Sequence, residues 1–109
     1  HQRSLVVLLT PLEPAAIEEG LLPVIPALVA RHRVVLGSVA DPAVGSMLAK
    51  RDTAADVYGA AAAERTVAMR QRVAAALERM GVDVIDAEAD ELPARLADHY
   101  LWLKSEGLL

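Results

Sequence analysis

The chain has 109 residues, 54% of them hydrophobic, and a length that supports one hydrophobic core rather than two. Its net charge of −4 and its small set of aromatic residues, two Tyr and one Trp, argue against nucleic-acid binding, which needs basic groups for phosphates and rings for bases. The absence of cysteine excludes disulfides, thiolate nucleophiles and thiolate metal sites. The longest stretch without a charge, Gly20–Ala30, is about half of the roughly 20 residues that a membrane-spanning helix needs, so we expect no membrane contact by this chain.

The first predicted element is a strand over Ser4–Thr10. The run is apolar between its terminal Ser and Thr, whereas a half-exposed antiparallel strand would alternate apolar and polar residues. This composition is typical of a parallel strand covered by helices on both faces, and it predicts a central position in a sheet.

A helix is predicted over Ala15–Arg31, with Pro14 in its first position, where a missing N–H does no harm. Pro23 and Pro26 lie inside this segment, and an interior proline removes a hydrogen bond and clashes with the preceding turn. We therefore expect a kink or a break near Leu22.

A second strand is predicted over Arg33–Val39, where β-branched residues are frequent and Gly37 indicates the close approach of a neighbouring backbone. After it, Asp41 is a candidate N-cap for a short helix that has Pro42 in its first position.

A long helix is predicted from Ala54 to Met80, where Thr53 and Asp56 have the spacing of a capping box. Apolar side chains, Tyr58 and Val73 among them, mark one face, and the arginines between Arg65 and Arg79 mark a face expected to lie in solvent. Gly81 suits the left-handed conformation that ends many helices.

The third predicted strand is Val82–Ala87, and its two aspartates favour an edge position. A last helix follows, for which we expect Asp90 as the cap, Pro93 in the first turn and Gly107 at the end.

This order of elements predicts an α/β fold with a three-stranded parallel sheet and helices on both faces. Residues 1–109 form one such unit. Within it Ser4–Thr10 would lie at an edge, which conflicts with its composition, because natural proteins avoid bare apolar edges. Either further strands precede it in the native protein, or two copies pair there as a homo-oligomer.

The carboxyl ends of the strands carry the candidate site residues Thr10, Glu13, Ser38 and Asp41, because ligands of open α/β sheets bind at that edge. One interpretation is an oxygen-rich site for a hard cation such as Mg²⁺. The other is that Glu13 and Asp41 only favour helix N-termini. His32 and His99 have no partner at metal-ligand spacing, and we expect structural roles for both.

From Arg3 onward the chain resembles the C-terminal half of a bacterial family known as domain of unknown function fifty-eight, whose members are von Willebrand factor A-like and are often encoded beside MoxR-type AAA+ ATPases. The segments that carry the resemblance are Leu5–Pro14, Arg31–Val35, Val57–Tyr58 with the alanine-rich helix after it, Leu77–Ala87 and Tyr100–Leu109.

The resemblance implies that Ser4–Thr10 is the fourth strand of a doubly wound, Rossmann-like sheet of six strands, and that this chain is the C-terminal part of that domain. The Asp-x-Ser-x-Ser loop, which supplies most ligands of the metal site in von Willebrand A domains, would precede it. Family members usually have Asp after the Thr of the fourth strand, where this chain has Pro11, so the departure weakens the expectation of Mg²⁺ even for the parent protein. The resemblance also implies a cytoplasmic location and a membrane-anchored parent.

Besides a purely structural role as half of a sheet, which predicts a dimer or larger assembly, two functional hypotheses follow. The first is a non-enzymatic protein-interaction module without a cofactor, which binds a protein partner at the carboxyl edge of the sheet; by resemblance the partner is a MoxR-type ATPase. The alternative is a metal-dependent small-molecule-binding or hydrolytic α/β enzyme that uses Thr10, Glu13 and Asp41.

Overall fold

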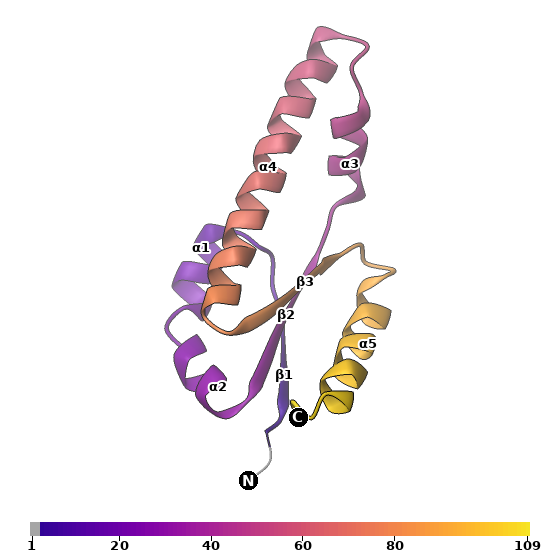
Figure 1. The fold of residues 1–109 in the computed structure, drawn as a ribbon. Coiled ribbons are helices and arrows are strands. Elements are labelled where there is room, and N and C mark those ends of the chain that lie inside the picture. The colour runs from indigo at the N-terminus through magenta and orange to yellow at the C-terminus, as the bar shows by residue number, and fades with distance from the viewer. Residues whose placement is uncertain (1–2) are drawn as a thin grey trace.

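The computed structural model describes residues 3–109 and confirms the predicted α/β fold with a three-stranded parallel sheet (Figure 1). The elements, in chain order, are β1 (Leu5–Leu9), α1 (Pro14–Ala16), the π-helical turn η1 (Ile17–Leu21), α2 (Ile25–Arg31), β2 (Arg33–Val39), α3 (Pro42–Ala49), α4 (Ala54–Arg79), β3 (Val82–Ala87) and α5 (Leu92–Ser105).

The strand order is β1-β2-β3, so the central strand is β2. Val34 to Ser38 of β2 are all buried, and Leu36 lies beside Leu8 on one side and Val84 on the other. β3 lies at an edge, as its aspartates predicted. β1 lies at the opposite edge in the described part of the chain, so the central position expected from its composition is not found there.

Helices cover both faces of the sheet, as expected. On one face, α1, η1, α2 and α4 pack over the strands and form the larger core (Figure 1). This core contains a buried cluster of large aliphatic side chains: Leu12, Ile17, Ile25, Val34, Leu36, Leu77 and Val82. Burying one such side chain contributes about 1.5–3 kcal/mol, so this face supplies most of the hydrophobic stabilisation.

The opposite face is covered by α5 alone. Its smaller core joins Leu92 to Val35, Ile85 and Ala87 of β2 and β3, with Leu5 and Leu96 packed against it. Gly37 belongs to this face, where an added Cβ would lie 3.1 Å from the side chain of Leu9 and 3.6 Å from side chains of α5. The close approach predicted at Gly37 is therefore made by side chains rather than by a neighbouring backbone.

The capping residues and helix breaks predicted from the sequence are found at the majority of helix ends. The first helix breaks between Leu21 and Ile25, as its prolines predicted. The Asp41 side chain caps α3 by accepting from the Ala43 N–H at 2.9 Å, and Thr53 and Asp56 form the capping box of α4. Asp90 was expected to cap α5 and does not, because α5 begins at Leu92 and its N-cap residue, Glu91, makes no side-chain bond.

The molecule is elongated, with extents of 59 × 28 × 17 Å. Its radius of gyration is 16.2 Å, whereas a compact chain of this length has about 13 Å. The excess comes from α3 and the N-terminal half of α4, which project together beyond the carboxyl ends of the strands (Figure 1). Tyr58, expected on the apolar face of the long helix, lies exposed on this projection.

Within residues 3–109, no helix is both long enough and apolar enough to span a bilayer.

Candidate functional site

The structure places Thr10, Glu13 and Asp41 at the carboxyl edge of the sheet, but it does not bring them together in one hollow. Thr10 follows β1, donates its backbone N–H to the Gly37 carbonyl at 3.1 Å, and lines a hollow of about 330 Å³ between β1 and the start of α5. Asp41 lines a separate cleft of about 570 Å³ against α3 and α4. Glu13 is the exposed N-cap residue of α1, makes no side-chain capping bond and lines neither hollow.

In the described range, 3–109, no group of three or more His, Asp or Glu side chains is arranged to hold a metal ion. The Asp41 carboxylate is already used as a helix cap. The Mg²⁺ site at Thr10, Glu13 and Asp41 stays a prediction, and the acidic residues near it supply no metal-binding cluster.

The fourth candidate, Ser38, belongs to a polar cluster that sequence reasoning missed. Ser38 is buried, and its hydroxyl accepts from the Arg70 guanidinium at 3.1 Å. The same guanidinium holds both carboxylate oxygens of Asp86, one of them from Nε at 3.1 Å. Arg70 thus ties α4 to the ends of β2 and β3, and the expectation that all arginines of this helix face solvent is wrong at Arg70.

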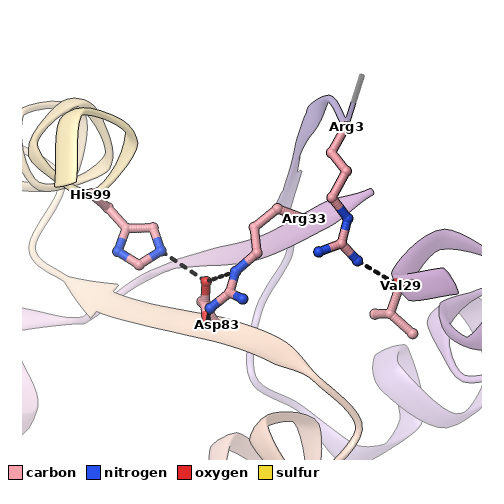
Figure 2. A network of polar contacts seen from close by, with 5 residues as sticks. All are labelled: Arg3, Val29, Arg33, Asp83 and His99. Atoms are coloured by element: carbon pink, nitrogen blue, oxygen red, sulfur yellow. Dashed lines mark hydrogen bonds and ion pairs between the residues drawn. The ribbon is translucent and has the colours of Figure 1, made fainter. Parts of the chain in front are cut away.

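A second polar network lies on the α5 face of the sheet (Figure 2). Arg33 of β2 donates two hydrogen bonds to the Asp83 carboxylate, at 2.9 and 3.0 Å. His99 of α5 contacts the same carboxylate through Nε2 at 2.9 Å and stacks on Trp102. Outside this network, at the start of β1, His32 accepts the Ser4 N–H at 3.3 Å and Arg3 donates to the Val29 carbonyl of α2. These contacts fit structural roles for His32 and His99.

In the described residues, β1 is an edge strand whose outer side has no paired strand. The Ser4 carbonyl and the Thr10 N–H are both bonded to β2, at 3.1 Å each. Because backbone groups alternate in direction along a strand, Val6 and Leu8 face β2 as well. The N–H and C=O groups of Leu5, Val7 and Leu9 therefore point away from β2, at the free side of the strand order.

The side chains of β1 are unequally covered. Val6 and Leu8 pack into the larger core. Leu5, Val7 and Leu9 point to the α5 face, where Leu5 packs against the smaller core, but Val7 and Leu9 are 44% and 70% exposed. Exposed apolar side chains and a free backbone edge thus coincide on one strand.

Comparison with known proteins finds no matching family model, no matching curated protein and no matching solved structure.

Proposed function

We propose that the chain is a non-enzymatic protein-interaction module, and that β1 is its main binding element. The observation that carries this proposal is the open edge of β1, where outward backbone groups lie beside the exposed side chains of Val7 and Leu9. An exposed, apolar, unprotected edge is a template for another strand. Pairing by strand addition uses main-chain hydrogen bonds for affinity and alternate side chains for specificity.

The family resemblance suggests the assembly in which such a module would work. In a von Willebrand A-like parent domain, β1 would lie inside a doubly wound sheet, and the assembled domain would work with a MoxR-type AAA+ ATPase. The parallel sheet order, with the most apolar strand outermost, supports this interpretation. The cytoplasmic location proposed for the module follows from the same resemblance.

When this chain is alone, the strand that occupies the edge is β1 of a second copy. The run Leu5-Val6-Val7-Leu8-Leu9 reads nearly the same in both directions about Val7. Antiparallel pairing centred on Val7 would place Leu5 of one copy opposite Leu9 of the other. The result is a continuous sheet across the two molecules, with the outward backbone groups of both strands satisfied.

Sedimentation equilibrium over a wide range of concentrations tests the pairing. The wild-type chain is expected to form a dimer, and Val7→Lys is expected to weaken dimerisation by about tenfold or more, because lysine on an edge strand opposes strand addition. Val57→Lys, at a site that is 50% exposed on α4, is the matched control and should leave the dimer intact.

A wild-type chain that stays monomeric with a folded core at all concentrations would contradict pairing through β1. Equal weakening by the two lysine substitutions would also count against it, since charge alone would then explain the loss.

A further inference from the structure

The cleft beside α3 and α4 is a second concave surface, distinct from β1. It has a volume of about 570 Å³, within the roughly 300–1,000 Å³ typical of binding pockets. One wall comes from α3, one from α4, and the base from the residues around the ends of the strands. In the part of the chain that the structure describes, no further helix or strand packs on α3 and the N-terminal half of α4 where they project beyond the sheet (Figure 1).

The cleft combines apolar lining with an acidic border. Its apolar residues include Leu12, Val44, Val67 and Val84. Its charged residues are four acids and one base: Asp41, Glu78, Asp86, Glu88 and Arg70. Arg70 is already paired with Asp86, and the Asp41 carboxylate accepts the backbone N–H of Ala43. Arg70, the one cation of the lining in the described residues, is therefore not bonded to Asp41, Glu78 or Glu88.

The apolar lining and the acidic border together indicate which kind of ligand the cleft can bind. The acidic border disfavours nucleic acids and other anions. The acids do not form a group of three that could hold a metal ion in the described residues, 3–109. A lysine or arginine side chain fits both features, because its aliphatic stem covers apolar surface while its charged head reaches the carboxylates.

We propose that this cleft binds an amphipathic helix of a partner protein, with apolar residues at three- and four-residue intervals on one face and lysine or arginine residues beside them. The apolar face of the helix lies on Val44, Val67 and Val84, and its basic residues meet Asp41, Glu78 and Glu88. Helix-in-groove recognition of this kind needs only an apolar groove and a complementary border. Binding at this cleft does not depend on strand pairing through β1, because neither Val7 nor Leu9 lines the cleft.

The probe is a fluorescently labelled helical peptide of leucine and lysine, about 14 residues long, or four turns. Fluorescence anisotropy measures its binding to the whole chain. A peptide with glutamate in place of every lysine should bind about tenfold more weakly or worse. Affinity for the lysine peptide should fall as salt is raised, because the charges that attract it are at the surface.

The variant Glu78→Gln with Glu88→Gln removes two border charges from exposed side chains and should weaken binding by about tenfold. The matched control, Glu18→Gln with Glu19→Gln, removes the same charge from exposed residues outside the cleft and should change affinity by less than about twofold. Val7→Lys should leave peptide binding unchanged, which separates this result from the outcome at β1.

Three results would overturn the proposal. The two double variants could weaken binding equally, which would show attraction to net charge alone. The glutamate peptide could bind as well as the lysine peptide. Spermine, which has amines but no apolar face, could displace the peptide at equal concentration, and the occupant would then be a small polyamine.

Discussion

Asp83 and Asp86 lie three positions apart on β3, so the alternation of a strand sends them to opposite faces of the sheet. Each meets a cation there: Asp83 is bound by Arg33 and lies against His99, and Asp86 is bound by Arg70. The aspartates correctly predicted an edge strand. Their partners could not be predicted, because Arg33 and Arg70 lie 50 and 16 residues away in the chain and only the packing of β2 and α4 brings them close.

Asp83→Ala tests the network on the α5 face. It removes the shared acceptor of Arg33 and His99, whose side chains are about a quarter exposed or less. The expected loss is about 1 kcal/mol of unfolding free energy, at the low end of the roughly 1–3 kcal/mol for unpaired buried groups because water still reaches this site. Urea denaturation measures it. Asp98→Ala, at an exposed acid of α5, is the control, and an equal loss there would show that the network does not stabilise the fold.

At the scale of elements, short-range signals predicted the helix ends well. Asp41, Thr53 and Asp56 cap the helices that their spacing indicated, and the prolines break the first helix where expected. The failure at Asp90 has a local reason: residues 89–91 form a turn, and the helix begins only at Leu92, whose side chain is buried against β2 and β3. α5 therefore begins where Leu92 packs into the core, without a capping side chain.

Two glycines give a pair of predictions of opposite sign. Gly81 ends α4 with φ of +93°, so Gly81→Ala should lower the unfolding free energy by about 1–2 kcal/mol, the strain of a side chain in the left-handed region. Gly20 lies in η1 with open space around an added Cβ, so Gly20→Ala should raise the unfolding free energy by about 0.5–1 kcal/mol. Thermal and urea denaturation of the two variants should move in opposite directions, and a shift of the same sign in both would contradict this conformational account.

At the scale of the whole molecule, the order of strands and helices was enough to predict the parallel sheet and its two helical layers. The candidate site was harder to predict. Thr10, Glu13 and Asp41 follow strands or begin helices at one edge of the sheet, but chain order does not say that Thr10 and Asp41 line different hollows. The cleft depends on the angle at which α3 and α4 leave the sheet, which no local pattern contains.

The conflict over β1 could be recognised from sequence and is explained by the fold. Its composition is that of a strand with neighbours on both sides, and its position gives it one neighbour, β2. The core under α5 is built mainly from β2 and β3 and takes up Leu5 of β1, so Val7 and Leu9 remain largely exposed on the same strand. The proposal of an interaction module rests on this difference between the composition of β1 and the single neighbouring strand that the described residues give it.

Amide hydrogen exchange of the chain, followed residue by residue at low and high protein concentration, tests this claim most directly. The amides of Val6, Leu8 and Thr10 face β2 and should be protected at both concentrations. Those of Leu5, Val7 and Leu9 face outward and should gain about tenfold protection or more at high concentration, when a second β1 pairs with them. If these three amides exchange rapidly at every concentration while the core stays protected, β1 does not pair with another strand and the central claim is wrong.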